Sequence, residues 1–228
     1  MKCLILAGGF GTRLYPLTIN RAKPLLEYKG KPIISHIVDK IPENINIMVN
    51  TNKKFEADFH KWQRTLNREM EVLIEEVLTE ERKLGAVGSL NFWIENKAID
   101  EDLLVIAGDN YFEFDLAQFI AKYDARHTLV AVHDIGDKGK ATQFGVVQLD
   151  GHRITGFQEK PAEPKSSLVA TACYIFPQRV FPILRQYCQQ GKKDNLGSFI
   201  AYLIDQDEVY AYTFTDFWTD IGSMEDLV

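Results

Sequence analysis

A short apolar segment at the start of the chain runs directly into a cluster of glycines. Residues 3–7 read Cys-Leu-Ile-Leu-Ala, and residues 8–11 read Gly-Gly-Phe-Gly. An apolar run of this length before glycines predicts a buried strand, Lys2–Leu6, that feeds a loop. Glycines lack Cβ atoms, so their backbone can approach a ligand or take positive φ, and their N–H groups can bind anionic oxygens. Arg13 and Lys23, just downstream, add the cations that a phosphate site needs.

Two common glycine-rich phosphate motifs do not match this loop. The P-loop requires four residues between its glycines and then Lys with Ser or Thr, whereas Gly11 is followed by Thr12 and Arg13. The dinucleotide fingerprint requires a third glycine, and Leu14 occupies that position. A loop that only made a tight turn would leave Arg13 and Lys23 unexplained. The segment therefore predicts a phosphate-binding loop of another kind.

The composition is that of a globular protein with a substantial core, since 46% of the 228 residues are hydrophobic and 25% are charged. A net charge of −6 argues against a nucleic-acid partner, which a basic surface would be needed to bind. The apolar runs are too short for a signal-peptide core or a membrane span, so we expect no membrane partner and a cytoplasmic location. Cys3, Cys173 and Cys188 lack metal-ligand spacing and are expected to be buried thiols.

Strand-like and helix-like segments alternate through the first half of the chain, which predicts a parallel sheet covered by helices. In the second half, Asp150-Gly151 separates Phe144–Leu149 from Ile154–Glu159 and predicts an antiparallel hairpin. The other predicted strands are Lys2–Leu6, Asn46–Val49, Val72–Glu75, Leu103–Ala107, Leu129–Val132, Val169–Phe176 and Val209–Thr213. The predicted helices are Pro32–Lys40, Phe55–Leu66, Val87–Glu95, Leu116–Tyr123, Arg179–Gln190 and Ser198–Ile204.

Two aspartates follow apolar segments that are far apart in the chain. Asp109 comes just after the run Leu103–Ala107, where a parallel sheet presents its carboxyl edge, and Asp220 lies in Trp-Thr-Asp-Ile-Gly. An aspartate after a strand can simply cap a turn, but a second one in a similar setting favours a ligand site. With phosphate oxygens, the pair would form the oxygen-donor set that suits Mg²⁺. We therefore expect Mg²⁺ as the cofactor.

Residues 6–18 read Leu-Ala-Gly-Gly-Phe-Gly-Thr-Arg-Leu-Tyr-Pro-Leu-Thr, and residues 23–26 read Lys-Pro-Leu-Leu. Together they resemble the signature of the sugar-1-phosphate nucleotidyltransferases. Later blocks resemble the same family in the same order: Gly-Asp-Asn at 108–110, Glu-Lys-Pro at 159–161 and Trp-Thr-Asp-Ile-Gly at 218–222. The resemblance therefore covers nearly the whole chain.

The resemblance implies a Rossmann-like α/β nucleotidyltransferase fold, with a mainly parallel central sheet, helices on both faces and an antiparallel sugar-binding excursion. It also implies that a sugar-1-phosphate oxygen attacks the α-phosphorus of a nucleoside triphosphate, releasing pyrophosphate and forming a nucleotide sugar. Arg13 would hold the leaving pyrophosphate and Lys23 would bridge toward the α-phosphate, as the catalytic pair. Asp109 and Asp220 match the family's metal-binding aspartates.

By the same resemblance, residues 1–228 form one domain, in which 1–135 mainly bind the nucleotide and 136–228 mainly bind the sugar phosphate and supply the second metal ligand. The nucleotide-binding residues would be Leu6, Ala7, Gly8, Gly9, Gly11, Thr12, Arg13, Gly85 and Asp109. The sugar-phosphate-binding residues would be Asn110, Gly145, Glu159, Lys160 and Thr171. Glu159 offers an acceptor for sugar hydroxyls and Lys160 can neutralise a phosphate, while Thr171 could instead be a structural hydroxyl.

The identity of the base and of the sugar is less constrained. The thymidylyl branch usually has Gln-Pro before the Leu-Gly segment at 84–85, and this chain has the mixed-charge run 75–83 there, which we interpret as a solvated loop. The substrates favoured are dTTP or UTP and glucose-1-phosphate. A guanylyl or cytidylyl transfer to another sugar-1-phosphate stays open.

Two other function classes stay open as well. A non-catalytic nucleotide-sugar-binding regulatory subunit would keep the fold, but it would have no chemical need for all of Arg13, Lys23, Asp109, Lys160 and Asp220. A nicotinamide-dependent dehydrogenase would need the third glycine and an acidic residue after the second strand, where residues 50–52 read Asn-Thr-Asn. The partners expected are a nucleoside triphosphate and a sugar-1-phosphate, and a homo-oligomer is compatible with the sequence.

Overall fold

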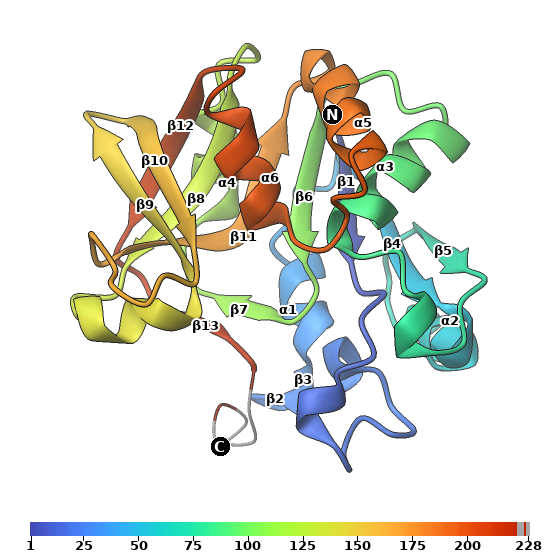
Figure 1. Ribbon diagram of the computed structural model, residues 1–228. Coiled ribbons are helices and arrows are strands. Elements are labelled where there is room, and N and C mark those ends of the chain that lie inside the picture. Colours follow the sequence, from blue (N-terminus) through green and yellow to red (C-terminus); the bar gives the residue numbers. More distant parts are fainter. Residues whose placement is uncertain (223–225, 227–228) are drawn as a thin grey trace.

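The computed structural model describes residues 1–222 and 226 (Figure 1). Over these residues a nine-stranded sheet has the order β5-β4-β1-β6-β11-β8-β12-β10-β9. Its strands are β1 (Lys2–Leu6), β4 (Asn46–Asn52), β5 (Met70–Glu75), β6 (Leu103–Ala107), β8 (Thr128–Asp134), β9 (Gly145–Asp150), β10 (Arg153–Glu159), β11 (Leu168–Phe176) and β12 (Val209–Phe214).

The sheet has a parallel half and a mixed half. Strands β5, β4, β1 and β6 are parallel, and β1 pairs with both of its neighbours without a register shift. β11 is antiparallel to β6 and β8, and β12 runs parallel to β8. The predicted hairpin is present, but it turns at Gly151-His152, one residue beyond the predicted Asp150-Gly151, because Asp150 still pairs with Arg153. β9 also pairs with β11, so this end of the sheet curls back on itself. The predicted α/β sheet with an antiparallel excursion is confirmed.

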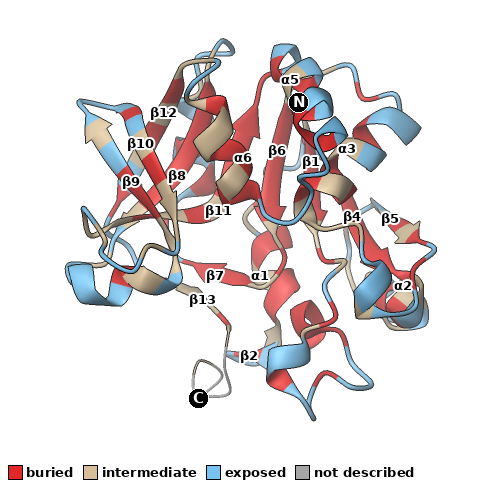
Figure 2. Cartoon of the chain, viewed as in Figure 1, coloured by how far each residue is buried: buried red, intermediate tan, exposed pale blue. Residues whose placement is uncertain are grey.

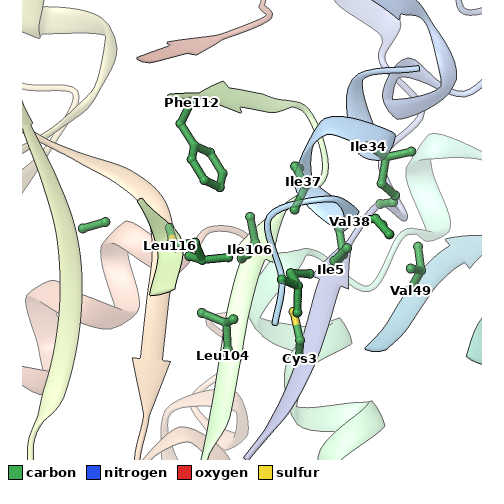
Figure 3. Packing of buried hydrophobic residues seen from close by; sticks show 14 of the residues in the cluster. Cys3, Ile5, Ile34, Ile37, Val38, Val49, Leu104, Ile106, Phe112 and Leu116 are labelled. Atoms are coloured by element: carbon green, nitrogen blue, oxygen red, sulfur yellow. The ribbon is translucent and has the colours of Figure 1, made fainter. Parts of the chain in front are cut away.

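Helices cover both faces of the sheet. The helices are α1 (Ile33–Val38), α2 (Glu56–Gln63), α3 (Ala86–Asn96), α4 (Leu116–Ala121), α5 (Phe181–Gln189) and α6 (Leu196–Leu203). Successive side chains of a strand point to opposite faces. Cys3 and Ile5 therefore join the core under α1, α2 and α4, while Leu4 joins the core under α3, α5 and α6. Figure 3 shows the first of these cores, with Ile106 of β6 near Ile37 of α1, and Figure 2 shows buried strands beneath helices with exposed outer faces.

Two short ribbons and several 3-10 turns were not predicted from the sequence. β7 (Asn110–Phe112) pairs antiparallel with β13 (Trp218–Asp220), and β2 (Glu27–Tyr28) pairs with β3 (Lys31–Pro32). The longest of these strands has three residues, which is too short for an alternating pattern to stand out in the sequence. The 3-10 turns are η1 (Thr12–Leu14), η2 (Lys23–Leu25), η3 (Lys53–Phe55), η4 (Glu80–Arg82), η5 (Lys138–Gln143) and η6 (Gln178–Val180).

Most predicted helices are a few residues longer than the observed ones. α1 begins after Pro32, which is its N-cap, and α2 begins after the 3-10 turn at Lys53–Phe55. Cys3, Cys173 and Cys188 are buried thiols, as expected, and burial raises the pKa of each. Within the described residues, every helix is too short or too polar to span a lipid bilayer.

Candidate active site

A cleft of about 1220 Å³ crosses the carboxyl ends of the parallel strands, and a smaller hollow of about 230 Å³ adjoins it. The two share Leu6, Gly9, Arg13 and Asp109 in their walls. Every site residue predicted from the sequence lines one or both of them. Those in the large cleft are Leu6, Gly8, Gly9, Arg13, Gly85, Asp109, Asn110, Gly145, Glu159, Lys160, Thr171 and Asp220. Ala7, Gly11, Thr12 and Lys23 line the smaller hollow.

The glycines of the first loop are needed for different reasons. Gly11 has φ +63°, and its carbonyl accepts a hydrogen bond of 2.7 Å from the Thr18 hydroxyl. A Cβ on Gly8 would lie 3.0 Å from Asn50 Nδ2 and 3.2 Å from Glu75 Oε2. A Cβ on Gly9 would meet no heavy atom within 4 Å, so the space above Gly9 is open. Residue 11 therefore sets the loop shape, while residue 8 leaves room for polar side chains beside the cleft.

Asp109 and Asp220 are brought together by the small β7–β13 ribbon. Asp220 pairs with Asn110, and the Ile221 N–H donates to the Asp109 carbonyl at 3.2 Å. The Trp218 indole N–H donates to Asn110 Oδ1 at 2.7 Å and fixes the ribbon from the other side. Segments more than a hundred residues apart in the chain thus place two carboxylates at the end of β6.

Lys23 lies between these carboxylates. Its ammonium nitrogen is 2.7 Å from Asp109 Oδ2 and 3.5 Å from Asp220 Oδ1. Burial lowers the pKa of Lys23, but the Asp109 and Asp220 carboxylates outweigh it and the net pKa is raised. Burial, together with repulsion from Asp109, raises the pKa of Asp220 in spite of Lys23. Two carboxylates thus share the one ammonium group of Lys23 at the end of β6.

Glu159 and Lys160 lie at the opposite end of the cleft, on β10 and just after it. Lys160 takes φ +45°, and its N–H donates to the Phe144 carbonyl at 3.0 Å. A Cβ on Gly197, at the start of α6, would lie 2.1 Å from Glu159 Oε2. Burial raises the pKa of Glu159, and Lys160 acts in the opposite direction. A half-buried carboxylate therefore stands beside an exposed ammonium group, which suits a polar, phosphorylated ligand.

Thr171 lies in a bulge of β11. Ala170 pairs with Val132 of β8 and Tyr174 pairs with Val130, so three residues of β11 lie opposite the single residue Ala131, and Ala172 takes φ +54°. The Thr171 hydroxyl donates to the Ala131 carbonyl at 3.0 Å. This bond is the structural role considered for Thr171, although the residue also lines the cleft. Bulges of this kind often redirect side chains next to binding sites.

A polar cluster at the ends of β4 and β5 was not predicted from the sequence. Asn50 Oδ1 accepts the Ala7 N–H at 2.9 Å, and Asn50 Nδ2 donates to Glu75 Oε1 at 2.6 Å. The Trp93 indole N–H donates to the same Glu75 oxygen at 3.2 Å. Glu75 is only 3% exposed, so the run 75–83 is not a solvated loop at its first residue. The available signal was its place at the end of a predicted strand, which the neighbouring charges obscured.

Several cations line the cleft. Among the described residues, no carboxylate lies within salt-bridge distance of Arg13, Lys140 or Lys160, whereas Lys83 pairs with Glu80. Unpaired cations around a cleft, with the buried Lys23 in the adjoining hollow, can bind several phosphate groups at once.

Proteins with related sequences include nucleotidyltransferases. A model of the nucleotidyl transferase family matches residues 2–228. The bifunctional protein GlmU of Methanocaldococcus jannaschii is 31% identical over 100% of this chain and 53% of its own length. A mannose-1-phosphate guanylyltransferase of Mycobacterium tuberculosis is 30% identical over 100% of this chain and 63% of its own. The chain thus spans about half the length of the GlmU proteins it matches.

Solved structures with a similar fold also include nucleotidyltransferases. A Bacillus anthracis structure assigned as a glucose-1-phosphate thymidylyltransferase, in complex with a sucrose, has a TM-score of 0.85 at 26% identity and covers 100% of this chain and 92% of its own. The inositol-1-phosphate CTP transferase of T. maritima shares the fold, with a TM-score of 0.83 at 18% identity over 100% of this chain and 91% of its own. By its sequence and its fold, this chain belongs to the nucleotidyl transferase family.

Proposed function

We propose that this protein transfers a nucleotidyl group from a nucleoside triphosphate to a sugar-1-phosphate. The observation that carries the proposal is the continuity of the cleft. It runs from the glycine loop and Arg13, past Asp109 and Asp220, to Lys160. Cations at both ends with acids between them suit a reaction that joins two phosphorylated substrates and releases pyrophosphate.

The chemistry needs little beyond positioning and charge. An oxygen of the sugar-1-phosphate attacks the α-phosphorus, the new P–O bond forms, and the bond from the α-phosphorus to the bridging oxygen breaks as pyrophosphate leaves. The attacking oxygen is already anionic at neutral pH, so no strong general base is required. Lys160 would hold the sugar phosphate, Lys23 the α-phosphate and Arg13 the pyrophosphate, with loop N–H groups as further donors.

The acidic pair fits Mg²⁺. Mg²⁺ usually takes one or two carboxylates and fills its other positions with water and substrate phosphates. Asp109 and Asp220 offer that set, since their carboxylates lie on either side of the Lys23 ammonium group, 2.7 Å and 3.5 Å from it. When bound, the ion would neutralise charge on the phosphates.

The finer assignments stay predictions. They are the division into 1–135 for the nucleotide and 136–228 for the sugar phosphate, glucose-1-phosphate as the sugar substrate, a cytoplasmic location, and a possible homo-oligomer. The relatives named above act on different bases and sugars. The family resemblance favours dTTP or UTP as the nucleotidyl donor, with a guanylyl or cytidylyl transfer as the alternative.

The test is a matrix of nucleoside triphosphates against hexose-1-phosphates, scored by pyrophosphate released with Mg²⁺ and with EDTA. We expect at least one pair to turn over, and only with the metal. A folded protein that binds nucleotide but releases no pyrophosphate in any combination would instead be the regulatory subunit considered above.

A further inference from the structure

Glu75 is a buried acid that the proposed reaction does not use. It ends β5, is 3% exposed and lines the large cleft. Burying a carboxylate is unfavourable unless other groups satisfy its oxygens. Two neighbouring side chains, Asn50 and Trp93, donate hydrogen bonds to Glu75 and hold it at the cleft wall.

Hydrogen-bond donors from the described part of the chain reach one of the two Glu75 oxygens. Asn50 and Trp93 both donate to Oε1, and each carboxylate oxygen can accept about two hydrogen bonds. Among residues 1–222 and 226, none donates a hydrogen bond to Oε2. Oε2 lies against Gly8, where a Cβ would be 3.2 Å away. The glycine therefore leaves Oε2 uncovered, with room for two donors from a ligand.

The position of Glu75 identifies which part of a ligand it would meet. This inference rests on the proposed function, which places the α-phosphate near Lys23 and the sugar phosphate near Lys160. Lys160 follows β10, toward one end of the strand order, whereas Glu75 lies on β5 at the other end (Figure 1). From the α-phosphate the nucleotide extends in two directions, toward the pyrophosphate, which Arg13 would hold, and toward the ribose and base. Glu75 and Gly85 wall the end of the cleft that remains for the base.

The bases differ in the hydrogen-bond donors that they offer to a carboxylate oxygen. Guanine carries two adjacent donors, N1–H and the N2 amino group. Adenine and cytosine each offer one amino group next to a ring acceptor, and uracil and thymine offer one N–H between two carbonyl acceptors. Those carbonyls would face the carboxylate oxygen, which is unfavourable. Guanine alone matches two free acceptor positions on one oxygen.

We propose that Glu75 reads the nucleotide base and selects guanine, so that GTP is the nucleotidyl donor. This replaces the preference for thymine or uracil that the family resemblance suggested. Asn50 and Trp93 act as positioning residues, because they hold Oε1 and so aim Oε2 into the cleft.

The first experiment uses the unmodified protein. Binding of GTP, inosine triphosphate, UTP and dTTP is measured by titration calorimetry with Mg²⁺ and without sugar phosphate. Inosine triphosphate differs from GTP only in lacking the N2 amino group. We expect GTP to bind about 10-fold more tightly than inosine triphosphate and about 100-fold more tightly than UTP or dTTP. Equal binding of GTP and inosine triphosphate would overturn the two-donor contact.

The second experiment compares Glu75→Gln with Glu76→Gln. A glutamine at 75 can still accept from Asn50 and Trp93, but it places an amide N–H₂ where Oε2 stood. The ratio of GTP to UTP affinity should fall at least about 10-fold in Glu75→Gln. Glu76, whose side chain is 77% exposed, is the matched control and should leave the ratio unchanged. An unchanged ratio in Glu75→Gln would contradict the proposal, and circular dichroism confirms that each variant is folded.

The outcomes separate this inference from the proposed function. If UTP or dTTP releases pyrophosphate faster than GTP, nucleotidyl transfer stands and the role of Glu75 fails. If GTP binds with the expected selectivity but no sugar-1-phosphate yields pyrophosphate, the role of Glu75 stands and the transfer reaction fails. If no triphosphate binds, both are overturned.

Discussion

The two ends of the cleft each carry a glutamate, and the two are held very differently. Glu75 ends a parallel strand, and two side chains fix one of its oxygens. Glu159 ends a strand of the curled hairpin, and no hydrogen bond joins its side chain to another described residue. Room for Glu159 comes from Gly197, where any Cβ would collide with its carboxylate.

The difference follows from the sheet around each residue. At the end of the cleft that holds Glu75, which is the proposed base end, β4 and β5 pair in continuous parallel register from Ile47 to Asn52. At the end that holds Glu159, which is the proposed sugar end, β10 has a register irregularity between Ile154 and Gly156, and β11 bulges before Tyr174. Regular strands hold a side chain in one orientation, whereas bulges bend the backbone and leave residues unpaired. We infer that the base end is pre-organised for one partner and that the sugar end is more adaptable.

The largest effect is expected from a change at Asp109, which lies between the two ends of the cleft. Asp109→Asn should lower kcat for pyrophosphate release several hundredfold, since one charge interaction at about 4 Å is worth roughly 4 kcal/mol at an effective dielectric of about 20. The fold should stay intact by circular dichroism. Asp205→Asn, at an exposed position outside the cleft, is the control. Pyrophosphate release at the normal rate in Asp109→Asn would remove the metal assignment.

The next change tests how rigid the base end is. Gly85 has φ +77° and ψ 159°, a conformation almost restricted to glycine, and a Cβ there would lie 2.3 Å from the Lys193 carbonyl oxygen. Gly85→Ala should lower the free energy of unfolding by at least about 2 kcal/mol in a urea titration. Gly9→Ala, with open space around its Cβ, should lower it little. Equal stability of the two variants would show that the base end is not constrained in this way.

A third change tests whether the two ends work separately. Lys160→Met removes an exposed ammonium group and should raise KM for the sugar-1-phosphate about 10- to 100-fold, the range for a hydrogen bond to a charged group. Affinity for the triphosphate should stay within about twofold, because the base end is untouched. Lys165→Met, at an exposed position outside the cleft, should change neither value. A parallel loss of triphosphate affinity in Lys160→Met would couple the two ends.

The smallest expected effect concerns Glu159 and pH. Burial raises its pKa above the ordinary 4.5, with Lys160 opposing the shift, so the folded state holds this proton more tightly than the unfolded chain. The ionised side chain therefore opposes folding above the folded pKa, and this penalty disappears as the pH falls below the unfolded value. Glu159→Gln should raise Tm modestly at pH 7.5 and leave it unchanged near pH 4. Glu163→Gln, which is exposed, should show no such pH dependence. A lower Tm for Glu159→Gln at pH 7.5 would contradict the argument.

Local pattern was sufficient for the regular part of the fold. Lys2–Leu6 and Leu103–Ala107 were predicted with the bounds that the structure shows, because a buried strand between helical layers requires a continuous apolar run. The glycine loop, Arg13 and Lys23 were recognisable for a similar reason, since they lie close together in the chain and their chemistry depends on residue type. The predicted site residues all line the cleft or the smaller hollow beside it, while their individual roles stay proposals.

The sequence by itself determined the strands of the main sheet, the helices that cover it, the glycine loop and the candidate acidic residues Asp109 and Asp220. Tertiary structure alone decided that Asp220 stands beside Asp109, through a three-residue ribbon, and that Glu75 is buried in the cleft wall, where Asn50 and Trp93 donate to it. The physical reason is that these features depend on contacts between residues distant in sequence. β13 finds its partner about a hundred residues away, and Asn50, Glu75 and Trp93 come from three different elements. A local pattern records which residues are apolar or charged, but only packing determines which of them meet.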